Sequence, residues 1–171
     1  MKKLDDKQER SVGFLVDGKI LNELSRQVSS HLFALGELMK NSYDAKSTKI
    51  DITFNKKERL LIVEDDGIGI SSNDFSSLLH IAKSGKEYGQ KFSFNRNKKT
   101  ITRYTQGSKG LGLFCAFKFG DLVIWNTKSE SESSKLIVNK IDVVEKADIS
   151  KINFPIRNGD RDKTGTTIVN P

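Results

Sequence analysis

Three polar side chains suited to hydrolytic chemistry recur at helical spacing early in the sequence. Glu37, Asn41 and Asp44 fall at positions i, i+4 and i+7, so they project from one stripe of a predicted helix. One face of this helix therefore presents a carboxylate and an amide a single turn apart. The simpler interpretation is a solvated helix face. The opposite stripe, which we expect to be packed, holds Leu35, Leu38, Met39 and Ser42.

Two glycine-rich strings follow this helix. Asp65 to Gly69 reads DDGIG and comes directly after a predicted strand, where two glycines permit a tight turn or a close approach of another group. Residues 107 to 113 read GSKGLGL and open an apolar run, so their amides could receive phosphates at a helix N-terminus. The pattern G-x-x-x-x-G-K-[ST] is absent, which excludes a P-loop. An ordinary turn and a flexible linker are the alternatives.

Four motifs, taken in their order along the chain, resemble those of a known ATP-binding module. They are E-x-x-x-N-x-x-D-A, D-x-G-x-G, the second glycine string and Thr164-Gly165-Thr166. DNA gyrase B, the ninety-kilodalton heat-shock chaperones, sensor histidine kinases and MutL-type mismatch-repair proteins (the GHKL superfamily) share this module. The resemblance spans about residues 29 to 170 and is nearest the chaperone-, MutL- and MORC-like branches. IAKSGK at 81 to 86 resembles the start of the chaperone lid, and GSKGLGLFCA resembles prokaryotic ATP-binding proteins of the superfamily.

The resemblance implies a role for each motif. Glu37 matches the general base, Asn41 the magnesium ligand and Asp65 the acceptor for the adenine amino group, while Thr166 supports that contact. Asp44 is implied to be structural or to act through water. The full set of implied nucleotide-contacting residues is Asn41, Asp44, Ala45, Asp65, Gly67, Gly69, Ile70, Lys83, Ser84, Gly107, Ser108, Lys109, Gly110, Leu111, Gly112, Leu113 and Thr166.

The elements that must position these residues can be predicted from periodicity and turn signals. Residues 11 to 28 predict a strap and a short helix. A helix follows over 30 to 43, capped by Ser29 or Ser30. Further helices are expected at 73 to 81 and 111 to 119, and strands at 50 to 54, 60 to 63, 122 to 126, 136 to 141 and 166 to 169. This order favours a two-layer α/β sandwich with a mostly antiparallel mixed sheet and helices on one face. The resemblance implies the same architecture, the Bergerat-type ATP-binding fold.

Length and composition indicate one domain over residues 1 to 171, with 36% hydrophobic and 30% charged residues. No apolar run approaches the roughly 20 residues of a membrane span, and no secretory signal opens the chain, so we expect no membrane partner. Cys115 is the one cysteine, which favours a packed thiol and a cytoplasmic location. Two histidines and one cysteine argue against a zinc site.

The net charge of +7 is concentrated in one stretch. Between residues 80 and 110 eight lysines and arginines stand against Glu87 alone. This stretch has few periodic apolar residues, and we expect residues 82 to 106 to form a mobile lid over the nucleotide. Three interpretations stay open: a solvated loop, a positive field for nucleotide phosphates, or a surface for nucleic acid.

The sequence therefore predicts magnesium-dependent binding of ATP and its slow hydrolysis to ADP and phosphate, used as a conformational or dimerisation switch. We expect the domain to be the N-terminal part of a larger protein, with further domains or protein partners and an ATP-dependent homodimer. In relatives a lysine or arginine from a following domain completes the γ-phosphate site, and Lys109 is the nearest internal substitute. The alternatives are an ATP sensor with negligible hydrolysis and a basic nucleic-acid-binding module.

Overall fold

The computed structural model describes residues 17–75, 87–107 and 112–171. Its helices are α1 (Ile20–Gln27), α2 (His31–Asp44), α4 (Gly112–Ala116) and α5 (Lys140–Val144), with short 3-10 turns η1 (Ser72–Asp74) and η2 (Ile149–Lys151). Its strands are β1 (Ile50–Asn55), β2 (Leu60–Asp65), β3 (Lys91–Arg96), β4 (Lys99–Tyr104), β5 (Leu122–Lys128), β6 (Ser133–Asn139), β7 (Arg157–Asn158) and β8 (Gly165–Asn170).

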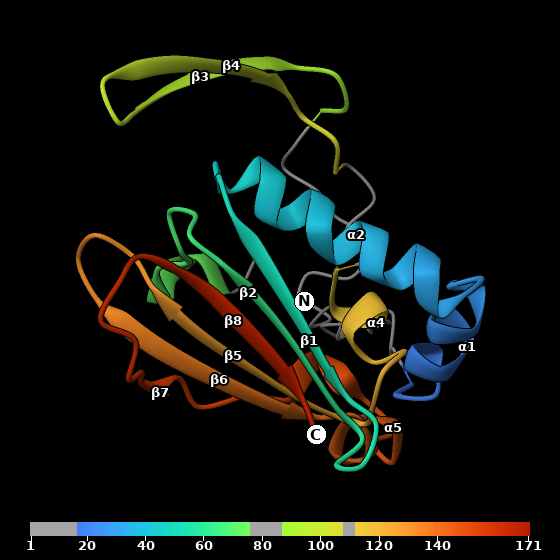
Figure 1. Cartoon of the computed structure of the whole chain (residues 1–171). Helices are drawn as coiled ribbons and strands as arrows, with labels where there is room; N and C mark the ends of the chain where they lie inside the picture. Colours follow the sequence, from blue (N-terminus) through green and yellow to red (C-terminus); the bar gives the residue numbers. More distant parts are fainter. Residues whose placement is uncertain (1–16, 76–86, 108–111) are drawn as a thin grey trace, which may run out of the picture.

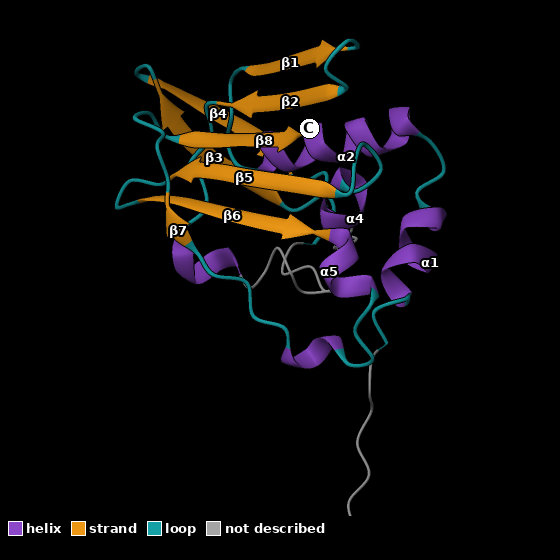
Figure 2. Cartoon of the chain, turned by 90° about the horizontal axis from the view of Figure 1, so that it is seen from below, coloured by secondary structure: helices purple, strands orange, loops and turns teal. Residues whose placement is uncertain are grey.

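Six strands form one sheet in the order β1-β2-β8-β5-β6-β7 (Figure 2). Every neighbouring pair recorded in this sheet is antiparallel. Helices α1, α2 and α4 gather on one side of the sheet (Figure 1). The predicted two-layer sandwich is thus confirmed. β8 comes last in the chain but lies third in the sheet, between β2 and β5.

The core forms where the inner face of the sheet meets the helices. β5 and β6 alternate buried and half-buried residues along their length, the pattern of strands with one covered face. Trp125 of β5 is 1% exposed, and Ala34 and Leu38 of α2 are equally buried. Cys115 of α4 is fully buried, which confirms the predicted packed thiol.

Helix α2 begins as predicted but presents a different face. The hydroxyl of Ser30 accepts a hydrogen bond from the amide of Phe33 at 3.0 Å, which confirms the N-cap. The predicted packing of Met39 is wrong, because this residue is 40% exposed. Leu38 and Ser42, which are 1% and 3% exposed, are buried as predicted, and Glu37 is also buried, at 7% exposed. The buried stripe therefore includes the candidate base rather than lying opposite it.

The lid region contains regular structure that the sequence analysis missed. β3 and β4 pair in a second, two-stranded antiparallel sheet, hereafter the ribbon, residues 91–104 (Figure 1). Asn97 and Lys98 at its turn have φ values of 50° and 62°, as a two-residue type I′ hairpin turn requires. The expectation of an aperiodic loop is wrong for this part. Its mobility stays a prediction.

Smaller differences concern element ends. The strand predicted to reach residue 141 ends at Asn139, whose side chain accepts from the amide of Ile141 and caps the unpredicted helix α5. α4 ends at Ala116, three residues short of its predicted end. The helix expected over 73 to 81 falls mostly outside the described residues, as does the strap before α1. No helix in the described part of the chain is long and apolar enough to cross a membrane.

Candidate functional site

The carboxylate of Asp65 lies at the centre of the candidate site, at the end of β2. Its Oδ2 accepts a hydrogen bond from the Ser42 hydroxyl of α2 at 2.8 Å. Its Oδ1 accepts from the amides of Gly67 at 2.9 Å and Thr166 at 3.2 Å. Asp65 is 7% exposed. Helix α2, strand β2 and strand β8 therefore fix one buried carboxylate.

Burial raises the pKa of Asp65, although the hydrogen bonds from Gly67, Ser42 and Thr166 oppose that rise. A carboxylate offers about four acceptor positions, and the three recorded bonds leave room for about one more donor. The arrangement is suited to one exocyclic amino group of a ligand.

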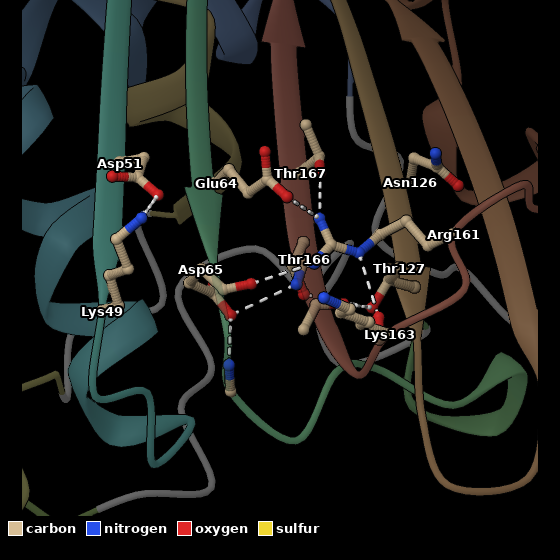
Figure 3. Close-up of polar contacts among 12 residues, drawn as sticks. Lys49, Asp51, Glu64, Asp65, Asn126, Thr127, Arg161, Lys163, Thr166 and Thr167 are labelled. Atoms are coloured by element: carbon tan, nitrogen blue, oxygen red, sulfur yellow. Dashed lines mark hydrogen bonds and ion pairs between the residues drawn. The ribbon is translucent and has the colours of Figure 1, made fainter.

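Thr127 of β5 connects this carboxylate to the glycine turn, and the sequence analysis missed it. Its hydroxyl accepts from the amide of Ile70 at 2.8 Å. The same hydroxyl lies 3.1 Å from the Gly165 carbonyl oxygen and 3.1 Å from the hydroxyl of Thr166, which Figure 3 shows beside it. Thr127 is fully buried. We call Ser42, Asp65, Gly67, Thr127 and Thr166 the Asp65 cluster.

The glycines of the turn are required by the backbone around them. A Cβ on Gly67 would lie 2.6 Å from the carbonyl oxygen of Ala45, which accepts from the amide of Ile68 at 2.9 Å. Gly69 has a φ of 72°, and a Cβ there would lie 2.1 Å from the carbonyl oxygen of Lys128. The turn is thus held between the end of α2 and the end of β5.

Arg161 supports the same strands from the other face of the sheet. Its guanidinium donates to the carbonyl oxygen of Asp65 and to Glu64 Oε1, both at 3.1 Å, and to the hydroxyl of Thr167 (Figure 3). Glu64 and Thr167 are register partners on β2 and β8. No sequence signal indicated Arg161, because it lies in a loop 96 residues from Asp65.

Asp44 holds the entry to the second glycine string. Its two carboxylate oxygens accept from the amides of Gln106 at 2.9 Å and Gly107 at 2.8 Å. A Cβ on Gly107 would lie 3.4 Å from Asn41 Oδ1. The structure therefore brings Asn41, Asp44 and Gly107 together. This supports a structural role for Asp44.

The remaining predicted residues of this region are only partly described. Gly112 begins α4, and Leu113 follows it in that helix. Lys83, Ser84, Ser108, Lys109, Gly110 and Leu111 lie outside the described residues. Their predicted contacts with phosphate are therefore untested.

Glu37 lies one turn before Asn41 on α2. Its Oε1 accepts a hydrogen bond from Lys40 Nζ at 2.7 Å. This contact raises the pKa of Lys40. The Lys40 contact fixes the orientation of the Glu37 carboxylate. A carboxylate so held can orient a water molecule.

The described residues could bind magnesium only together with the phosphates of a bound nucleotide. They contain no group of three or more histidine, cysteine, aspartate or glutamate side chains able to hold a metal ion. Asn41 offers one amide oxygen beside the glycine string. Mg²⁺ commonly takes one or two protein ligands and completes its shell with phosphates and water. Asn41 fits that mode.

Two arginines join the ribbon to the body. Arg96 donates to the carbonyl oxygen of Asp66 at 2.6 Å and to its carboxylate at 2.8 Å. Arg103 donates to the carbonyl oxygen of Tyr43 at 3.0 Å, and its guanidinium carbon lies 4.3 Å from the centre of the Tyr43 ring. The ribbon therefore contacts both the glycine turn and the end of α2.

Asp66 has further fixed partners. Burial acts to raise its pKa, but hydrogen bonds from Thr48 and Lys49 and the charge of Arg96 outweigh burial and lower the pKa. The amides of Thr48 and Lys49 donate to Asp66 Oδ1 at 2.6 and 2.9 Å. Asp66 is thus a structural carboxylate beside the candidate ligand acceptor Asp65.

Comparison with known proteins identifies relatives of this arrangement. The family described as histidine kinase-, DNA gyrase B-, and HSP90-like ATPase matches residues 28–166. The chaperone protein HtpG of Wolinella succinogenes is 31% identical over 120 residues, covering 67% of this chain and 19% of that protein. HtpG of Sulfurimonas denitrificans is 29% identical over 156 residues, covering 87% of this chain and 23% of the relative.

A relative of another kind is the ATPase MORC2B of Mus musculus, which is 31% identical over 120 residues, 66% of this chain and 11% of that protein. The chain thus spans less than a quarter of the length of each of these relatives. The similarity concerns only part of each relative.

Proposed function

Because the chain belongs to the family of histidine kinase-, DNA gyrase B- and HSP90-like ATPases, we propose that it binds ATP with magnesium and hydrolyses it slowly. The observation that carries this proposal is the buried carboxylate of Asp65 with three fixed donors. The remaining acceptor position pairs with the amino group of adenine. Guanine, which carries a carbonyl oxygen at the corresponding ring position, is disfavoured because two acceptors would face each other.

The phosphates are proposed to lie toward Asn41 and Gly107, where the second glycine string begins. Asp44 fixes the backbone of Gln106 and Gly107, so the start of the second glycine string has its conformation before a ligand binds. A bound magnesium ion neutralises phosphate charge, and Asn41 is the residue proposed to hold it.

Glu37 is proposed to orient the attacking water and accept its proton. The Lys40 contact at 2.7 Å holds the carboxylate in place. We propose that nucleotide occupancy alters the lid and the N-terminal strap, and so drives dimerisation or signals to other domains. An ATP sensor with negligible hydrolysis uses the same binding site and differs only in turnover.

The binding test is calorimetry with ATP and magnesium on wild type and Asp65→Asn. An asparagine at this position can keep the Gly67 and Thr166 bonds through its oxygen and donate to Ser42 through its nitrogen, so the fold is preserved. That nitrogen faces the adenine amino group, and we expect affinity to fall by about 30- to 1,000-fold, or about 2–4 kcal/mol. Asp51→Asn, an exposed carboxylate on β1, is the matched control. Equal affinity in all three proteins contradicts the assignment.

Turnover tests the role of Glu37. Glu37→Gln is expected to lower the hydrolysis rate by about 10²- to 10⁴-fold while leaving ATP affinity almost unchanged. Unchanged turnover would show that Glu37 is not the base. A collapse of affinity would show that its carboxylate is structural. Wild-type binding without measurable turnover would favour the sensor.

A further inference from the structure

The ribbon has an outer face that takes no part in the contacts described above. Exposed and half-buried residues alternate along β3, and along β4 from Thr100 onward. Phe92, Phe94, Arg96, Ile101 and Arg103 are half-buried, and the two arginines among them bond to the body. The exposed outer face consists of Lys91, Ser93, Asn95, Thr100, Thr102 and Tyr104.

This outer face is an ordered row of small hydrogen-bonding side chains. Ser93 and Thr102 are directly opposite, with hydroxyls 2.9 Å apart. In the next pair the Thr100 hydroxyl donates to Asn95 Oδ1 at 2.8 Å, which leaves the Asn95 amide nitrogen as a donor. Both pairs are held in place before any partner binds. Such pre-ordering lowers the entropy lost on binding.

Positive charge surrounds this row, and among its cations Arg96 is paired with Asp66. Residues 88–107 contain five lysines and arginines and no aspartate or glutamate. Lys91, Lys98 and Lys99 are exposed, and within the described residues no ion pair is recorded for any of them. Lys91 is at one end of the ribbon, and Lys98 and Lys99 are at its turn. An extended anion with regularly spaced charges matches this distribution.

We propose that the outer face of the ribbon binds double-stranded DNA in its major groove. Each strand has six residues, so the ribbon is about 20 Å long and its strands are about 5 Å apart. The major groove is about 12 Å wide and admits a two-stranded ribbon. Serine, threonine and asparagine can then reach base edges, while the lysines at both ends contact phosphates.

The attachment of the ribbon suits this role. Arg96 and Arg103 hold the inner face against the body, so the outer face has a fixed orientation. Figure 1 shows the ribbon apart from the six-stranded sheet. A-form RNA has a deep and narrow major groove that side chains cannot read, so duplex DNA is the expected partner rather than duplex RNA.

The experiment measures fluorescence anisotropy of a labelled 20-base-pair DNA duplex, and of an RNA duplex of the same sequence, over a range of salt concentrations without nucleotide. We expect DNA to bind more tightly than RNA. The double variant Lys98→Gln/Lys99→Gln should reduce the slope of log K against log salt by about 2, or about 0.9 for each lost phosphate contact. The matched control Lys56→Gln/Lys57→Gln removes two adjacent lysines from the β1–β2 turn and should leave the slope unchanged.

A second variant separates groove contacts from charge. Ser93→Ala/Asn95→Ala keeps every lysine, so it should retain the salt slope but lose the preference for DNA over RNA. Absence of DNA binding at low salt overturns the proposal, as do equal affinity for both duplexes and equal slope changes in the two lysine variants. Because no nucleotide is present, these outcomes are independent of ATP binding.

Discussion

The Asp65 cluster and the ribbon are built by opposite means. The cluster joins residues from α2, β2, β5 and β8, all buried and linked by hydrogen bonds of 2.8 to 3.2 Å. The ribbon is a local hairpin whose outer side chains are exposed, and two arginines attach it to the body. The geometry of the cluster therefore depends on the whole fold, and that of the ribbon mainly on its own sequence. Chemically identical substitutions should have unequal effects in the two regions.

The largest difference is expected between two glycines with nearly the same backbone conformation. Gly69 beside the cluster has a φ of 72°, and Gly89 at the root of the ribbon has a φ of 77°. A Cβ on Gly69 would meet the backbone of Lys128, whereas nothing lies within 4 Å of one on Gly89. We expect Gly69→Ala to lower the free energy of unfolding by about 2–4 kcal/mol and Gly89→Ala by about 1 kcal/mol. Urea denaturation measures both, and equal losses would contradict the comparison.

A pair of threonines gives the next largest effect. Thr127→Val removes the acceptor for the partly buried amide of Ile70, and we expect a loss of about 1–3 kcal/mol in the free energy of unfolding. ATP affinity should fall as well, because the glycine turn loses its tie to β5. Thr102→Val on the exposed face of the ribbon should change stability by no more than about 0.5 kcal/mol. Should both variants unfold at the same urea concentration, the hydroxyl of Thr127 is not essential.

Removing the contacts that attach the ribbon to the body tests whether the ribbon contributes to the stability of the whole domain. Arg96→Gln/Arg103→Gln removes both attachments, yet these contacts are partly exposed, so we expect the free energy of unfolding to fall by only about 1 kcal/mol. Protease cleavage within residues 87–107 should increase. Lys91→Gln, which removes a cation from the outer face of the same strand, is the control and should leave cleavage unchanged. A global loss as large as that of Thr127→Val would show that the ribbon belongs to the core structure.

The smallest effect concerns two adjacent carboxyls, Asp65 and Asp66, whose contributions to folding stability should depend on pH in opposite directions. Burial raises the pKa of Asp65 above 3.8, so the folded state holds its proton longer than the unfolded state. Stability is therefore lost as pH rises from about 3.8 through the raised pKa. For Asp66 burial opposes the shift, but hydrogen bonds from Thr48 and Lys49 lower its pKa. Its contribution is present above 3.8 and is lost as pH falls through the lowered value.

Denaturation of wild type and Asp65→Asn between pH 3 and pH 7 measures the Asp65 contribution. Asp65→Asn should lack the loss of stability that we expect for wild type as pH rises above about 3.8. Adenine binding by wild type should weaken as pH falls through the raised pKa, because protonation removes the acceptor. Parallel stability curves for the two proteins would exclude a raised pKa at Asp65.

The sequence was sufficient to predict the sandwich, a cap at Ser29 or Ser30 and a strand beginning at Thr166, and the resemblance implied that Thr166 supports Asp65. It could not indicate Thr127 or Arg161, because their partners are set by strand order and register. Glu37 was placed on a solvated stripe, although burial of a helix depends on the surface that covers it. Phe92, Phe94 and Ile101 alternate as a hairpin does, yet the high lysine content concealed that pattern.

The position of β8 has a consequence for how the domain is made. β1 pairs with β2, β5 pairs with β6, and in the described residues only β8 joins these two hairpins. When synthesis has reached residue 160, the strands of both hairpins are therefore present, but β8, which joins the hairpins, is not. Thr166 is also missing at that stage, so Asp65 lacks one of its donors. Such late, non-local pairing slows folding and leaves strand edges open for association with other chains until synthesis passes residue 170.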